Sequence, residues 1–154
     1  MSEGPDERVA GPGGPLGVAE ARRGVLAATE EAERAALRPA DPGGLPHPLR
    51  AALAARVARL HDAPDLARAY EEGAGEARPL ADPATPGEGR EAAICAFVDL
   101  AAARTAEAAA ADVAALREAG VAEPDIVRLA GLVAFLAYRI RVAAGLRLLG
   151  DAVR

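Results

Sequence analysis

The sequence contains no tryptophan and very few other aromatic residues, which together make up 3% of the chain. Strands draw heavily on aromatic and β-branched residues, so this chain is poor in the material of a sheet. Alanine, leucine, arginine and glutamate dominate instead, and these are strong helix formers. No segment shows the alternating pattern of a half-buried strand. We therefore expect an all-α protein.

Cysteine is almost absent, because Cys95 is the only one in 154 residues. A single cysteine excludes an internal disulfide. His61 and Asp65 are four residues apart and could share a helix face, but two ligands do not make a zinc site, and the expected chain break at 62–64 separates them. His47 lies between two prolines and is interpreted as an exposed loop residue. The sequence therefore predicts neither a metal nor a cofactor.

Charge and hydropathy exclude several kinds of partner. The formal net charge is −5, and the arginines are interspersed with acids, so there is no basic stripe for nucleic acid or an anionic membrane. The first residues, MSEGPDERVAGPGG, lack the apolar centre of a secretory signal. The longest apolar run, 129–138, is too short to span a bilayer and is followed by Arg139 and Arg141. We expect a cytoplasmic protein without a membrane segment.

Proline and glycine divide the chain into segments. Residues 1–17 are rich in both and predict a disordered tail, which leaves 18–154 as a single helical domain. Helices are expected over 18–37, from about 48 to 61, and from Asp62 to about Gly73, with Asp62 as the N-cap of the third. Residues 75–89 are a Pro/Gly-rich connection, and a further helix is expected over 90–103.

The most informative stretch is 107–149, which has the pattern of a short helix, a glycine stop and a long helix. Gly120 can take the left-handed conformation that ends a helix, and Val121 then packs back on the last turn. Pro124 suits the first turn of the next helix. Apolar residues then recur close to every 3.6 positions, at Ile126, Leu129, Val133, Leu136, Ile140, Ala144 and Leu148.

Other apolar residues of this long helix lie off that stripe, namely Phe135, Val142, Leu146 and Leu149. A helix that is apolar on more than one face is buried on more than one face. The pattern therefore predicts that the helix is the centre of a bundle, a subunit interface, or both.

The stretch ADVAALREAG, the following valine and AEPDIVRLAGLVAFLAYRIRVAAGLRLLG together resemble the C-terminal half of the carboxymuconolactone decarboxylase / alkylhydroperoxidase D-like family. Upstream, RAALAARVARLHDAPDLARAY resembles the helix pair that carries the redox centre of that family. The resemblance covers roughly residues 40–150 and implies an all-α, alkylhydroperoxidase D-like bundle that assembles into trimers or hexamers. The matching positions in the C-terminal half are Asp112, Leu116, Ala119, Gly120, Asp125, Ile126, Val127, Ala134, Phe135, Arg141 and Gly145.

The chemistry of that family depends on a C-x-x-C-x-x-x-H motif with a glutamate upstream, in which a thiolate at a helix start attacks peroxide. On this chain the two cysteine positions fall at Ala63 and Leu66, and the histidine position falls at Tyr70. The glutamate position falls near Ala51. The resemblance therefore implies a family member that lacks the redox motif, with no catalytic residue at the family positions.

The remaining candidates each have a structural and a functional interpretation. Cys95 lies in an apolar helix and is interpreted as a buried small hydrophobe rather than a reactive thiol. Tyr70 either packs its ring in the core or offers its hydroxyl to a ligand. Arg139 and Arg141 either form interface salt bridges or bind a carboxylate ligand, and Arg141 matches the arginine of the family. Tyr70 and Arg141 are thus the possible pocket residues.

Three functions follow. The first is a non-redox binding or structural homo-oligomer, with a cysteine-bearing paralogue as its candidate companion. The second is an enzyme with non-thiol chemistry in the same pocket, such as decarboxylation of a lactone acid. The third is residual hydroperoxide reductase activity through Cys95 alone.

Overall fold

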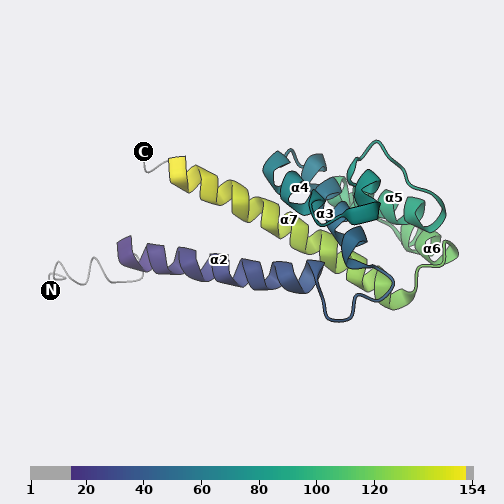
Figure 1. Ribbon diagram of the computed structural model, residues 1–154, viewed down its shortest axis with the longest axis horizontal. Helices are drawn as coiled ribbons and strands as arrows, with labels where there is room; N and C mark the ends of the chain where they lie inside the picture. The colour runs from purple at the N-terminus through teal and green to yellow at the C-terminus, as the bar shows by residue number, and fades with distance from the viewer. Residues whose placement is uncertain (1–14, 152–154) are drawn as a thin grey trace. The chain divides into compact units, whose positions relative to one another are not determined.

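The computed structural model describes the backbone of residues 15–151 and the side chains of residues 22–148 (Figure 1). Over that range the chain is helical and contains no strand, which confirms the all-α class. Helix α2 spans Pro15–Leu37, so it begins three residues before the predicted start. The rest of the predicted disordered tail, residues 1–14, lies outside the described residues.

The chain divides into two compact units, residues 1–35 and 36–154, and the division falls within α2. In the first unit the hydroxyl of Thr29 donates to the carbonyl of Val25 at 2.7 Å, one turn back along the helix. The predicted domain 18–154 therefore contains the whole second unit and part of the first.

The second unit holds the remaining elements. They are α3 (His47–Leu60), α4 (Pro64–Glu71), the 3₁₀ helix η1 (Gly75–Ala81), α5 (Gly89–Ala103), the 3₁₀ turn η2 (Thr105–Glu107), α6 (Ala110–Glu118) and α7 (Glu123–Asp151). Helix α3 is central, because it contacts α4, η1, α5 and α7. It is rich in alanine, and Ala52, Ala54, Ala55 and Ala58 are completely buried, so its neighbours can approach closely on several sides.

The predicted glycine stop at Gly120 is confirmed. Gly120 has φ +81°, and its N–H donates to the carbonyl of Arg117. The N–H of Val121 donates to the carbonyl of Leu116 at 2.9 Å, which completes the two-bond pattern that closes a helix C-terminus. Val121 is buried, as expected for the residue that packs back on the last turn.

The predicted N-cap role of Asp62 is wrong. Asp62 has φ +56° and belongs to the end of α3, where its N–H donates to Arg59 and the next N–H, of Ala63, donates to Ala58. This is the same closing pattern as at Gly120, with an aspartate in the left-handed position that glycine usually takes. The N-cap of α4 is Ala63, which has no side chain able to accept a bond.

The Pro/Gly-rich connection is more regular than the sequence predicts. Residues Gly75–Ala81 form η1, although Pro79 lies inside it. A short 3₁₀ helix tolerates this proline because few of its N–H groups have an internal acceptor to lose. Leu80 and Ala81 are buried there, so η1 is held by packing against α3 as well as by its own bonds.

Over residues 123–148, whose side chains the structure describes, helix α7 is buried on one stripe only, and mainly in its N-terminal half. The buried residues include Leu129, Val133 and Leu136 of the predicted stripe, while Leu148 at its far end is 72% exposed. Phe135 packs partly against the core. By length and composition Glu123–Leu148 could cross a membrane, with a mean hydropathy of 1.6 in its most apolar window, of which 22% is buried. The predicted short apolar run is therefore part of a longer apolar helix.

Candidate functional site

The residues that the resemblance places at redox positions are mostly enclosed. Ala63 and Tyr70 are buried and Leu66 is half-buried, all on or beside α4. Arg141 is exposed on the C-terminal half of α7. Neither Tyr70 nor Arg141 lines the pocket described below. A ligand site made jointly by Tyr70 and Arg141 therefore stays a prediction.

Cys95 lies in the middle of α5 and is 1% exposed, which confirms that it is a buried residue. Burial raises the pKa of its thiol, and the nearby positive charge of Arg56 opposes that rise only in part. A buried neutral thiol is a poor nucleophile.

The histidines lie apart from any metal-binding group. His61 and Asp65 are exposed, and within the described part of the chain no three His, Cys, Asp or Glu residues come together as a metal site. His47 is exposed, as predicted, but it is the first residue of α3 rather than a loop residue. Its Nε2 lies 3.0 Å from the carbonyl oxygen of Pro39.

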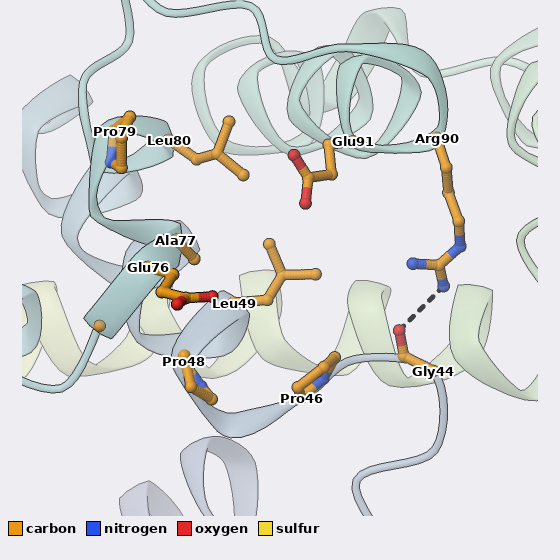
Figure 2. Close-up of a pocket in the computed structure, with 11 residues that line it drawn as sticks. Gly44, Pro46, Pro48, Leu49, Glu76, Ala77, Pro79, Leu80, Arg90 and Glu91 are labelled. Atoms are coloured by element: carbon orange, nitrogen blue, oxygen red, sulfur yellow. Dashed lines mark hydrogen bonds between the residues drawn. The ribbon is translucent and has the colours of Figure 1, made fainter.

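A pocket of about 840 Å³ lies between the N-terminal end of α3, η1 and the start of α5 (Figure 2). Its volume is within the range of small-molecule sites. Much of the lining is apolar or rigid, because the N-terminal end of α3 and η1 both contribute proline and leucine, while α5 contributes two charged residues. The lining residues are Gly44, Pro46, Pro48, Leu49, Gly75, Glu76, Ala77, Pro79, Leu80, Arg90 and Glu91.

Two carboxylates from different elements face this pocket. Figure 2 shows Glu76 of η1 and Glu91 of α5 pointing toward Leu49 from two sides. Both residues are exposed, and no hydrogen bond or ion pair joins either carboxylate to another described residue. The pocket therefore carries two negative charges without a counter-ion in the described residues. It favours a neutral or cationic ligand over an anion.

One end of the pocket is closed by Arg90. Its Nη2 donates to the carbonyl of Gly44 at 2.9 Å, as the dashed line in Figure 2 shows, and lies 3.9 Å from a carboxylate oxygen of Asp125. Because the guanidinium of Arg90 interacts with both of these groups, it lies at this end of the pocket and does not neutralise Glu76.

Asp125 organises the backbone behind that end. It is 6% exposed, and its two oxygens accept the N–H of Gly44 at 3.0 and 3.1 Å. Arg128 donates to the same carboxylate at 3.0 Å and also to Asp41 at 3.0 Å. The carboxylate is thus hydrogen-bonded as a buried charge must be. It ties the first turn of α7 to the loop before α3.

This close approach explains the pair Gly43-Gly44. Gly43 has φ +58°, and a Cβ on it would lie 2.5 Å from Oδ1 of Asp125. A Cβ on Gly44 would collide with the other oxygen of Asp125 and lie 2.9 Å from Arg90. Only glycine leaves room for the carboxylate and the guanidinium at both positions.

Two buried arginines of α3 hold the loops that flank the pocket. Arg50 is 3% exposed and donates to three carbonyls of the preceding segment: Leu45 at 2.8 Å, Ala36 at 2.9 Å and Pro42 at 3.1 Å. Burial lowers the pKa of Arg50, but a guanidinium remains charged in proteins. The five donors of the guanidinium fork make this capture of several carbonyls possible.

Arg56 plays the same role for the loop after η1. It is 1% exposed and forms a two-bond ion pair with Asp99 of α5. It also donates to four backbone carbonyls, which belong to Leu80, Asp82, Pro83 and Thr85. The hydrogen bond to Asp99 raises the pKa of Arg56. Since the carbonyls it captures include that of the lining residue Leu80, Arg56 fixes one wall of the pocket.

Sequence reasoning missed this pocket and the arginines that hold it. Its lining comes from three segments that only the tertiary fold brings together. One signal was available: Arg50 and Arg56 stand in an Ala/Leu-rich helix next to loops rich in proline and glycine. Such loops leave many carbonyls without a helical partner, and an arginine on the neighbouring helix can satisfy them.

No protein-family model, curated protein or solved structure matches this chain. The resemblance to the alkylhydroperoxidase D-like family therefore depends on the residue pattern of 40–150 alone, and the structure shows the all-α class.

Proposed function

We propose that this chain is a non-redox, homo-oligomeric protein of the carboxymuconolactone decarboxylase / alkylhydroperoxidase D-like type, acting in the cytoplasm as a binding or structural oligomer. The non-redox part is supported by the thiol positions of the family, which hold buried Ala63 and half-buried Leu66. Cys95 is buried in the middle of α5 rather than at a helix start. The companion of this oligomer would be a paralogue that supplies the cysteines.

The observation that carries the oligomer is the exposure of α7. Only 22% of its most apolar window is buried, and Val127, Tyr138 and Leu148 are 71%, 43% and 72% exposed. Soluble monomers rarely leave such an extended apolar surface in water. Burying a large apolar side chain contributes about 1.5–3 kcal/mol, so several such contacts together offset the cost of association.

Sedimentation velocity at micromolar concentration tests this proposal. The wild-type chain should sediment as an assembly larger than the monomer. Leu148→Glu should dissociate that assembly, because it places a charge on the exposed apolar face. Ala110→Glu on α6 is the matched control and should leave it intact. A wild-type chain that sediments as a stable monomer would overturn the oligomer.

The pocket between α3, η1 and α5 supports the binding part of the proposal. It suits a mainly apolar molecule with a neutral or cationic end, since Glu76 and Glu91 repel anions. Titration calorimetry with an alkylammonium ion and the matching alkyl carboxylate should show binding of the ammonium alone. The double variant Glu76→Gln, Glu91→Gln should lose that preference, while Glu72→Gln, outside the pocket, should keep it. Equal binding of both probes would contradict the assignment.

The alternative of a decarboxylase acting on a lactone acid has weaker support. Its substrate carries a carboxylate, and in this pocket Arg90 is already bonded to Gly44 and close to Asp125. The two remaining charged groups have the wrong sign to bind such a substrate. Residual hydroperoxide reduction through Cys95 requires a thiolate that burial disfavours.

A further inference from the structure

A second, outward-facing stripe runs along α7 opposite to its buried one. It is spaced by alternating steps of four and three residues, the heptad spacing of helices that pair with another helix. Its members, here called the outer face, are Val127, Gly131, Ala134, Tyr138, Arg141, Gly145 and Leu148. All are exposed except half-buried Gly145.

The outer face is shaped for close approach. A Cβ placed on Gly131 or Gly145 would meet no other atom within 4 Å, so the space above both glycines is open. Glycine in a helix is costly unless something uses the room that it leaves. Along the outer face the small residues Gly131 and Ala134 are followed by the large Tyr138 and Arg141, and Gly145 is followed by Leu148, so the surface has both hollows and projections.

Charge is distributed unevenly along α7 and selects the direction of a partner helix. Residues 123–137 contain Glu123, Asp125 and Arg128, whereas 138–148 contain three arginines and no acid. Parallel pairing of two copies would place each arginine-rich half beside its equivalent and set Arg141 against Arg141. Antiparallel pairing separates these halves and also opposes the two helix dipoles.

We infer that the outer face of α7 pairs antiparallel with the outer face of a second copy of this chain, about a two-fold axis near residues 139–140. In this register Tyr138 faces Arg141 of the second copy, which suits a cation over an aromatic ring. Gly131 faces Leu148 of the second copy, so the large leucine side chain packs over the glycine. Ala134 faces Gly145, where the two backbones come closest.

This inference rests on the proposed oligomer and names its interface. Each contact occurs twice because the pairing is two-fold, so the surface is self-complementary. The pairing spans residues 131–148, a helix length of about 27 Å. A two-fold interface joins chains in pairs, so it is compatible with a hexamer made of three such pairs. It cannot by itself form a trimer.

Cysteine cross-linking in the full-length chain tests the direction and register. Ala134→Cys and Gly145→Cys are prepared separately and oxidised alone and after mixing. In the antiparallel pair, residue 134 lies next to residue 145 of the other copy, within disulfide reach. The same residue lies about 16 Å from its own equivalent, which is beyond reach. The mixture should therefore form a covalent dimer, and neither protein alone should.

Three controls make the outcomes distinct. Ala111→Cys, exposed on α6, should form no dimer with itself or with either variant. If Ala134→Cys and Gly145→Cys each cross-link alone, the helices are parallel and the inference is overturned, although the oligomer stands. If the wild type sediments as an oligomer and the mixture gives no dimer, another surface is the interface. If the wild type is a monomer that sediments with neutral lipid vesicles, a membrane covers this face and both proposals fail.

Discussion

Arg56 and Asp99 form a bidentate ion pair across 43 residues of sequence: Nε donates to one carboxylate oxygen at 2.5 Å and Nη2 to the other at 2.6 Å. The pair joins α3 to α5, and the remaining donors of Arg56 hold the loop between η1 and α5. The same guanidinium thus fixes two helices and the chain that connects η1 to α5.

Replacing Arg56 should be among the most destabilising single changes in this chain. Arg56→Ala removes the ion pair and leaves four loop carbonyls without their donor. Loss of one partner from a buried pair costs about 3–5 kcal/mol. Urea unfolding should show this loss in the free energy of unfolding. Arg59→Ala on the exposed side of α3 is the control, and an equal loss in both variants would refute the special role of Arg56.

Gly44→Ala should destabilise the fold through a steric conflict. The new methyl would occupy space held by the carboxylate of Asp125, which cannot move freely because it is buried and bonded to Arg128. Forcing an extra methyl into such a place costs about 1–3 kcal/mol. Gly24→Ala is the comparison, because a methyl there meets no atom within 4 Å. A thermal melt in which both variants match the wild type would contradict the clash.

Cys95 should be unreactive in the native protein. Burial raises its pKa and blocks access, so a thiol reagent should label it far more slowly than in denaturant. Equal labelling rates in the two conditions would show that the thiol is accessible.

The raised pKa of the Cys95 thiol makes the free energy of unfolding depend on pH. Because the folded pKa lies above the unfolded one, the unfolded chain loses the proton first. The contribution of Cys95 is therefore complete below about pH 8.5, the ordinary thiol pKa, and falls as the pH rises further. Between pH 7 and pH 9.5 the urea midpoint should fall more for the wild type than for Cys95→Ala. Parallel falls would refute the assignment.

The chain should not turn over organic hydroperoxides. Position 63 is an alanine and position 66 a leucine, and the thiol of Cys95 is enclosed. The measurement is peroxide consumption with a dithiol reductant, against a buffer blank. Turnover that disappears in Cys95→Ser would establish peroxidase chemistry and refute the proposed non-redox function.

The end of α6 and the start of α7 were predictable because their signals are local. Gly120 ends α6 by its own conformational freedom, and Pro124 begins α7 by its fixed φ. The left-handed Asp62 was not predictable in the same way, since aspartate at that position has an equally good local alternative as an N-cap. Two roles compete for one residue there, and the packing of α3 against α4 decides between them.

The candidate site was not predictable, because its parts interact over long sequence separations. Asp125 fits the first turn of a helix from the sequence alone, yet its bond to Gly44 spans 81 residues. The division of α7 into a buried and an exposed stripe depends on which side α3 and α5 cover. Residues 135, 142 and 146 are off the predicted stripe but half-buried, so they do not mark the open face.

The arginines of α3 have a consequence for how the rigidity of the pocket would be measured. Arg50 and Arg56 are hydrogen-bond donors, so the backbone groups that they bind are carbonyl oxygens. They do not bind the N–H groups of the loops. Hydrogen–deuterium exchange reports on amides alone. Loop amides near residues 36–45 and 80–85 that have no acceptor of their own would exchange quickly although their backbone is fixed. Protease resistance, which responds to the whole backbone, would show those same loops as ordered.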